Sequence, residues 1–215
     1  MRNTFQRELR ELHNELIKMG TLCENAISAA IKGLLTQDEE LVRKVFQTDS
    51  EIDKKERDVE KMSLHLLLTQ QPVASDLRMT SAALKMVSDM ERIGDQASDI
   101  AEITRQLLEK ELPKTCIPEM GDAAITMVTE SIDAFVHNDL DLARKVMRDD
   151  DALDELFVDF QHRIVELMKE NAEEGTTYVD LLMIAKYLER IGDHATNIAE
   201  WVEYSLTGLY KGDRL

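Results

Sequence analysis

The stretch Leu188–Ala199, "LERIGDHATNIA", decides the fold, because the chain has already written nearly the same text at Met90–Ala101, "MERIGDQASDIA". The two segments lie 98 positions apart and share Glu-Arg-Ile-Gly-Asp without a change. Both segments are composed largely of good helix formers, so each is expected to lie within a helix. A repeat of this length indicates that the chain contains two copies of one structural unit.

The similarity extends upstream of these segments. The text "ELVRKVFQTD" (Glu40–Asp49) resembles "DLARKVMRDD" (Asp141–Asp150), here at an offset of 101 residues. The change of offset from 101 to 98 predicts a later loop that is three residues shorter in the second copy. The segment Glu111–Glu119, "ELPKTCIPE", contains two of the three prolines and is the predicted linker. We therefore expect one unit over residues 1–112, a linker over 113–118 and a second unit over 119–215.

Each unit is predicted to contain three helices. Glycine (8 of 215 residues) and proline (3) are scarce, and few Val/Thr/Tyr runs are bounded by turn residues, so strands are not indicated. Breaks are expected at 36–41, with Thr36 or Asp38 as the cap, and at 70–77, with Pro72 at a first helical position. The second unit breaks at 136–141 and 172–178. Short connections favour antiparallel neighbours, so the predicted fold is all-α, with two tandem three-helix bundles.

The third helix of each copy carries an apolar seam with spacings of four and three residues, which predicts its buried face. The seam residues of the two copies are Met86, Met90, Ile93, Ala97, Ile100 and Thr104, and Ile184, Leu188, Ile191, Ala195, Ile198 and Val202.

A stripe of oxygen-bearing side chains recurs on the same helices at i, i+4 spacing and is predicted to face outward, opposite the seam. Carboxylates at this spacing repel one another mildly, and they suit hard or borderline cations such as Mg, Mn, Fe and Zn. The alternative interpretation is a solvated acidic face without a ligand. The predicted metal ligands on the stripe are Glu91, Asp95 and Asp99 in the first copy and Glu189, Asp193 and Asn197 in the second, with Glu102 and Glu200 extending it.

The second helix of each copy is expected to complete these sites. Asp53 lies 19 residues before Pro72 and Glu91 lies 19 residues after it, so an antiparallel pair places them at similar height. Asp49 then lies level with Asp95. Asp150 and Asp154 are the counterparts in the second copy. The alternative is that acids near a helix start are present because the helix dipole favours them.

Charge excludes several classes of partner. The formal net charge is −17, of which residues 1–110 contribute −4 and residues 111–215 contribute −13. This balance argues against a broad nucleic-acid footprint and against attraction to anionic lipid, and it suits cations or basic partners. No apolar signal segment and no membrane-length apolar run occur, and Cys23 and Cys116 show no zinc or redox spacing. We expect a cytoplasmic protein that does not insert into the membrane.

Motifs of catalysis are missing from the sequence. No P-loop, no G-x-G-x-x-G, no H-E-x-x-H and no Glu-x-x-His occur, and Asp159-x-x-His162 is a lone near match. We therefore expect no enzyme, with no catalytic and no organic cofactor-binding residues.

The duplicated segments Glu91–Glu102 and Glu189–Glu200 resemble those of the PhoU family of phosphate-uptake regulators, and the resemblance covers Phe5 to about Leu206. It implies a cytoplasmic, often dimeric adaptor. Its expected partners are the ATPase and membrane subunits of a Pst-type phosphate ABC transporter and the sensor kinase of the phosphate two-component system. Some members bind metal clusters through E/D-x-x-x-D motifs, which match Glu91/Asp95, Asp95/Asp99, Glu189/Asp193, Asp49/Asp53 and Asp150/Asp154. Asn197 departs from this pattern, because a neutral amide is a weaker ligand.

Two other functions remain open at this point. One is a metal-dependent hydrolase that acts on phosphoesters or polyphosphate through clustered ions. The other is a structural bundle whose acidic face is inert.

Overall fold

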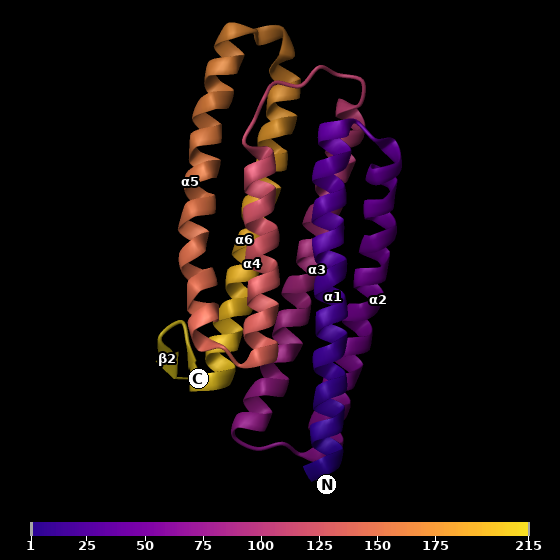
Figure 1. Ribbon diagram of the computed structural model, residues 1–215, viewed down its shortest axis with the longest axis vertical. Coiled ribbons are helices and arrows are strands. Elements are labelled where there is room, and N and C mark those ends of the chain that lie inside the picture. The colour runs from indigo at the N-terminus through magenta and orange to yellow at the C-terminus, as the bar shows by residue number, and fades with distance from the viewer. Residues whose placement is uncertain (1, 215) are drawn as a thin grey trace.

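The computed structural model describes residues 2–214 and confirms the all-α prediction (Figure 1). Five of the six helices are longer than 30 residues, or about 45 Å at 1.5 Å per residue. A 3₁₀ turn, η1 (Ala172–Glu174), precedes the last helix, and a hairpin of two-residue strands, β1 (Leu209–Tyr210) and β2 (Asp213–Arg214), follows it. The helices are α1 (Arg2–Thr36), α2 (Glu39–Gln70), α3 (Ser75–Leu107), α4 (Ile117–His137), α5 (Leu140–Glu170) and α6 (Gly175–Thr207).

The second helix of each copy begins at the same kind of cap. Asp38 Oδ1 accepts hydrogen bonds from the backbone N–H groups of Glu40 (2.9 Å) and Leu41 (3.2 Å), which leaves Asp38, and not Thr36, as the N-cap of α2. Asp139, 101 residues later, accepts from the N–H of Leu142 at 3.0 Å and caps α5. The duplication thus preserves the chemistry that starts these helices.

The third helices begin differently from the sequence prediction. Pro72 is not at a first helical position, because α3 starts only at Ser75. Its N-cap is Ala74, whose φ of 51° lies where residues with a β-carbon are rare. In the second copy, the predicted break 172–178 is shorter than expected, because η1 leads into α6 at Gly175.

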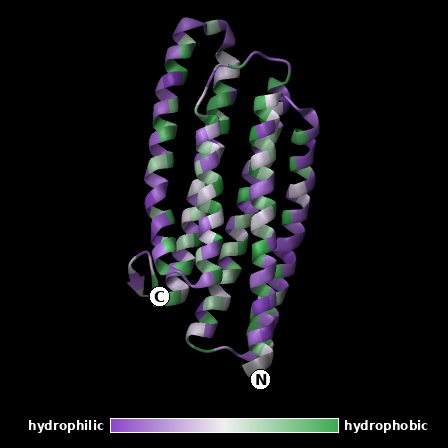
Figure 2. Cartoon of the chain, in the orientation of Figure 1, coloured by the Kyte–Doolittle hydropathy of each residue, from purple (hydrophilic) through white to green (hydrophobic). Residues whose placement is uncertain are grey.

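The six helices form two antiparallel three-helix bundles that lie side by side (Figure 1). The first contains α1, α2 and α3, and the second contains α4, α5 and α6. The bundles meet mainly through α3 against α6 and α1 against α4, whereas α2 and α5 lie on the outside. Every residue of both predicted seams is buried. Hydrophobic and hydrophilic residues alternate along each helix, as amphipathic packing requires (Figure 2).

Within residues 2–214, no helix combines the length and the hydrophobicity needed to cross a membrane.

Candidate functional site

The acids of α2 and α3 lie in one groove of the first bundle. Burial raises the pKa of the Asp49 carboxyl above its ordinary value, and the charges of Asp53, Asp95 and Asp99 raise it further. The Ser98 hydroxyl lies near the carboxylate and lowers that pKa in part. Asp49 on α2 therefore lies among acids of α3, as the antiparallel register predicts. Because these carboxylates repel one another, binding of a cation in the groove would be favourable.

Gly94 makes room for Asp49 in this groove. A β-carbon at Gly94 would lie 3.0 Å from Asp49 Oδ1 and 3.0 Å from Cδ1 of Ile52. Mid-helix glycine costs about 1 kcal/mol relative to alanine, so its presence here reflects the close approach of α2. Asp49 Oδ1 is buried and finds no hydrogen-bond partner among the described residues. A buried carboxylate oxygen without a donor is an available ligand for a cation.

Glu91 occupies the next turn of the groove. Burial raises its pKa, followed by the charge of Asp95, and Glu56 and Asp53 on α2 add smaller effects. Arg92 partly offsets this charge, because its guanidinium lies 2.9 Å from Asp95 Oδ2 and 3.5 Å from Glu91 Oε2. Glu91 therefore shares its environment with the acids of α2.

The second bundle repeats this arrangement around Asp150. Burial, and then the charges of Asp193, Asp154 and Glu189, raise the pKa of Asp150 to about 6. A β-carbon at Gly192 would lie 3.3 Å from Asp150 Oδ1, which repeats the relationship between Gly94 and Asp49. Both copies thus fold an aspartate of the second helix against a glycine of the third.

The stripe does not face outward along its whole length, and this part of the prediction is wrong. The side chains of Glu91 and Glu189 are only 23% and 12% exposed, because α2 and α5 cover that side of the third helices. Glu189 also pairs with Lys186 on its own helix. Glu91 and Glu189 therefore line a groove between two helices of their bundle, whereas Glu102 and Asp193 are exposed to solvent.

Asp99 and Asn197, which occupy equivalent positions in the two stripes, are directed to the other bundle. Asn197 Nδ2 donates to Asp89 Oδ1 on α3 at 3.1 Å, and His194 Nδ1 lies 2.9 Å from the same oxygen. At the equivalent position of the first copy, Asp99 lies beside Tyr187 on α6. Burial raises the pKa of both groups; the Tyr187 hydroxyl partly lowers the pKa of Asp99, and the charge of Asp99 further raises the pKa of Tyr187. Asp99 and Asn197 thus contribute to the contact between α3 and α6, although the charge of Asp99 also acts on Asp49.

The carboxylate oxygens of the grooves suit a hard cation, but the side chains do not converge on one point. Between residues 2 and 214, no three His, Cys, Asp or Glu side chains are arranged to enclose a metal ion. The fit rests on the carboxylate chemistry, on the unpartnered Asp49 Oδ1 and on the space that Gly94 leaves.

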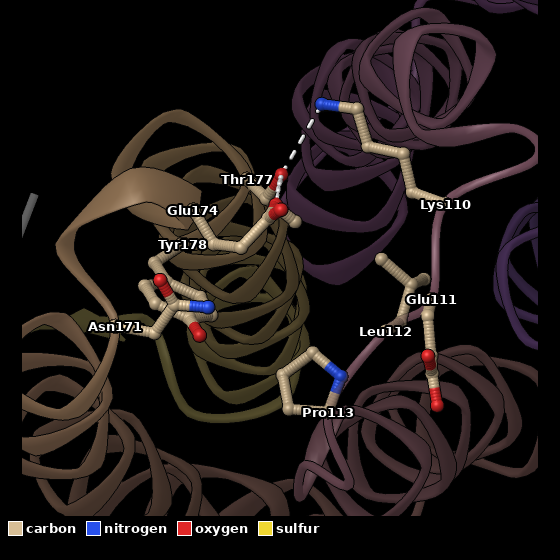
Figure 3. A pocket seen from close by; sticks show the side chains of 8 residues that line it. All are labelled: Lys110, Glu111, Leu112, Pro113, Asn171, Glu174, Thr177 and Tyr178. Carbon is tan, nitrogen blue, oxygen red and sulfur yellow. Dashed lines mark hydrogen bonds between the residues drawn. The ribbon is translucent and has the colours of Figure 1, made fainter.

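A separate cavity of about 450 Å³ lies where the linker passes the α5–α6 connection (Figure 3). Lys110 Nζ reaches across it and donates to Thr177 Oγ1 at 3.1 Å, and Thr177 donates to Glu174 at 3.0 Å. Gln37 holds the same linker from the first bundle, accepting from the N–H of Glu109 at 2.6 Å. The cavity contains none of the predicted ligands, and its polar contacts tie the linker to both bundles.

Several residues of these grooves escaped the sequence prediction. Ser98 and Thr196 occupy equivalent positions, and each hydroxyl lies near the aspartate of the second helix. The equivalent positions of Ser98 and Thr196 in the two copies are a pattern from which this role could be predicted. Asp89 and Tyr187 carried no such signal, because equivalent positions hold different residues and their partners belong to the other bundle.

Comparison with known proteins supports one family. The model described as "PhoU domain" matches residues 16–104 and 117–202, once in each bundle. A phosphate-specific transport system accessory protein PhoU homolog of Clostridium acetobutylicum is 36% identical over 211 residues, covering 96% of both chains. The crystal structure of PhoU from Pseudomonas aeruginosa superposes with a TM-score of 0.91 at 35% identity, covering 95% of this chain and 100% of that one. The phosphate transport system regulatory protein PhoU from Streptococcus pneumoniae gives a TM-score of 0.87 at 29% identity, covering 95% and 98%.

Proposed function

This chain belongs to the PhoU family, and from that premise we propose that it regulates phosphate uptake as an accessory protein of a phosphate transport system. In this proposal it acts in the cytoplasm, as a homodimer, between the subunits of a Pst-type ABC transporter and a phosphate-sensing kinase. The observation that carries the proposal is the similarity over nearly the full length of relatives that bear this description. It is not expected to catalyse a reaction.

The proposal assigns a metal ion to each groove. In the first bundle Asp49, Asp53, Glu91 and Asp95 would hold it, because these four acids act on one another across α2 and α3. The bound ion would neutralise carboxylates that now repel one another. Iron, zinc, manganese and magnesium are the candidate metals, since all accept oxygen ligands.

In the second bundle the equivalent ligands are Asp150, Asp154, Glu189 and Asp193. Asn197 and Asp99 are assigned a smaller part, because Asn197 already donates to Asp89 and Asp99 lies beside Tyr187. The charge around Asp150 supports a site in this copy even though Asn197 replaces an aspartate there.

The experiment that tests the metal proposal is elemental analysis of the purified protein beside Glu91→Ala/Asp95→Ala. We expect stoichiometric metal in the wild type and about half of it in the variant, because the second bundle keeps its own groove. Arg43→Ala/Glu40→Ala, which removes an exposed ion pair outside the grooves, is the matched control and should keep full metal content. A wild-type protein that stays metal-free after incubation with each of the four metals would contradict the metal proposal.

The adaptor proposal has its own test. The purified protein is added to a reconstituted Pst-type transporter in nanodiscs and, separately, to the soluble part of the sensor kinase. Saturable binding to both is expected. If neither binds, the adaptor proposal is wrong whatever the metal content.

A further inference from the structure

The groove between α5 and α6, here called the second groove, contains a lysine among its acids. Lys186 Nζ forms an ion pair with Glu189 on its own helix and lies 5.2 Å from the centre of the Phe157 ring on α5. An ammonium group over an aromatic face is attracted by the electrons of the ring, so Phe157 helps to hold the lysine in place. The second groove therefore already contains a positive charge beside one of its proposed metal ligands.

The antiparallel register of α5 and α6 shows where this lysine stands in the row of acids. Asp150 lies against Gly192, with its Oδ1 3.3 Å from the place of a β-carbon there. The next turn brings Asp154 level with Glu189, and Lys186 lies on the turn after it. The ammonium group thus stands at the end of the row, within one turn of two proposed ligands. A divalent ion bound by these acids would be repelled by it.

The duplication shows that the bundle does not require a lysine at this position. The equivalent residue of the first copy is Ser88, and the equivalent of Phe157 is Glu56. Burial raises the pKa of Glu56, and the charges of neighbouring acids raise it further. Its charge in turn acts on Glu91. Where the second groove holds an ammonium group over a ring, the first groove therefore holds an additional carboxylate.

The first groove has a cation as well, but that cation is held less closely. Arg92 lies 3.5 Å from Glu91 Oε2, and its side chain is 59% exposed. Lys186 is bonded directly to Glu189, whose side chain is only 12% exposed. Ion pairs between exposed neighbours on a helix contribute little, because both partners stay in water, whereas a pair with a nearly buried carboxylate is screened less. Displacing Lys186 is therefore the more costly step.

Building on the metal sites of the proposed function, we propose that Lys186 is a built-in counter-ion of the second groove, which a divalent metal ion must displace from Glu189 before it binds there. The two grooves then differ in affinity, and the first groove fills at a lower metal concentration than the second. Both grooves fill when metal is in excess.

The test isolates the second groove in the Glu91→Ala/Asp95→Ala background, which removes ligands from the first groove alone. Lys186→Ser introduces the residue of the first copy, and Lys186→Arg retains the positive charge. Lys169→Ser is the matched control, because it removes an equal charge from the exposed last turn of α5. Circular dichroism checks that each variant is folded.

Each protein is freed of metal with a chelator and titrated with Mn²⁺, and in a second series with Zn²⁺, by calorimetry. We expect Lys186→Ser to bind about tenfold more tightly than the background, because a repelling charge is gone. Lys186→Arg and Lys169→Ser should stay within about threefold of it. Unchanged or weaker binding by Lys186→Ser would overturn the role of the lysine while leaving the metal site in place. Absence of binding of both metals by the wild type would instead contradict the metal proposal itself.

The reciprocal substitution tests the same inference in the first groove. Ser88→Lys places an ammonium group three residues before Glu91, as Lys186 stands three residues before Glu189, and Ser88 is exposed, so the longer side chain has room. In an Asp150→Ala/Asp154→Ala background, this variant should bind Mn²⁺ about tenfold more weakly than the background alone. Equal affinity would overturn the proposal, because a lysine at this position would then not compete with metal.

Discussion

Gly20 on α1 lies directly against Ile132 on α4, so that a β-carbon on the glycine would come within 2.4 Å of Ile132 Cδ1. The relationship recurs in reverse 101 residues later, where a β-carbon on Gly121 would come within 2.0 Å of Ile31 Cδ1. Each bundle thus presents the same glycine and the same isoleucine to the other. This reciprocity is that of an isologous twofold interface, here within one chain.

Gly20→Ala should therefore destabilise the protein, even though alanine is the better helix former. Overpacking costs about 1–3 kcal/mol, which outweighs the gain of up to about 1 kcal/mol from helix propensity. Urea unfolding measures the difference. The double variant with Ile132→Val, which removes Cδ1, should recover most of the loss. A Gly20→Ala protein as stable as the wild type would show that Ile132 Cδ1 moves aside without cost.

The helices and seams within each bundle were more predictable from sequence than the contact between the bundles. Apolar periodicity and the internal repeat predicted six helices and both seams. Each of these features depends only on the residues of one helix and on their counterparts in the other copy. The prediction that the stripe faces outward was wrong, because a helical wheel assumes that a helix has only one buried face. On α3, Gly94, Gln96 and Ala101 are buried in addition to the seam, since the helix packs against α1, α2 and α6.

The partners of Asp89 and Tyr187 could not be predicted for a related reason. A duplication reveals which residues are equivalent, but it does not reveal which faces of the two units meet. The contact of Asp89 with Asn197 joins positions 108 residues apart that occupy different places in the repeat. The reciprocal contact of Asp99 with Tyr187 joins the same two places of the repeat, but a single sequence does not show which places of the two units face each other.

Asp89→Ala should weaken the contact between the bundles, because His194 and Asn197 lose their shared acceptor. A half-buried donor without a partner costs about 1–3 kcal/mol, and thermal unfolding should report it. Asp89→Asn keeps a carbonyl oxygen in place and should lose less than the alanine variant. If the alanine variant unfolds at the wild-type temperature, these hydrogen bonds contribute nothing to holding α3 on α6.

His13 should make stability depend on pH. It lies on α1 with its ring edge-on to Phe135 of α4 at 5.1 Å, and burial lowers its pKa from 6.5. Above pH 6.5 both folded and unfolded states are neutral at this position. As pH falls below 6.5 the unfolded state binds the proton first, so stability is lost until the lower folded pKa is passed.

The measurement compares the wild type with His13→Leu by urea unfolding at several values between pH 8 and pH 5. Carboxylates that titrate in the same window cancel in the difference. The difference should move in favour of the leucine variant as pH falls through and below 6.5. A difference independent of pH would mean that the imidazole titrates alike in both states.

Asp150→Asn should stabilise the protein in the presence of a chelator. The carboxylate is partly buried and repelled by Asp193, Asp154 and Glu189, which raises its pKa to about 6. Removing that charge should gain about 1 kcal/mol after allowance for its solvent-exposed part. Added manganese or zinc should raise the melting temperature of the wild type more than that of the variant. Equal increases in the melting temperature of the wild type and the variant would show that the metal does not bind in this groove.

Tyr210→Ala should be visible in the fluorescence of Trp201, the single tryptophan of the chain. The two rings stack at 4.2 Å, and Lys211 beside them pairs with Glu200 at 3.1 Å. Loss of the stack should shift the emission to longer wavelength and cost about 0.5–1.5 kcal/mol. Tyr204→Ala, which removes the edge-on ring at 5.7 Å, is the comparison and should change the emission less.

The α2–α3 and α5–α6 connections lie at opposite ends of the molecule and differ in charge (Figure 1). Residues 62–77 contain one charged side chain, that of Asp76, whereas residues 163–175 contain six. If the two copies were identical, rotation about the twofold axis that relates them would leave the molecule unchanged. Unequal ends remove that ambiguity, so a partner that recognises one end fixes the orientation of the whole rod. The divergence of two equivalent turns thus gives a nearly symmetric protein a direction.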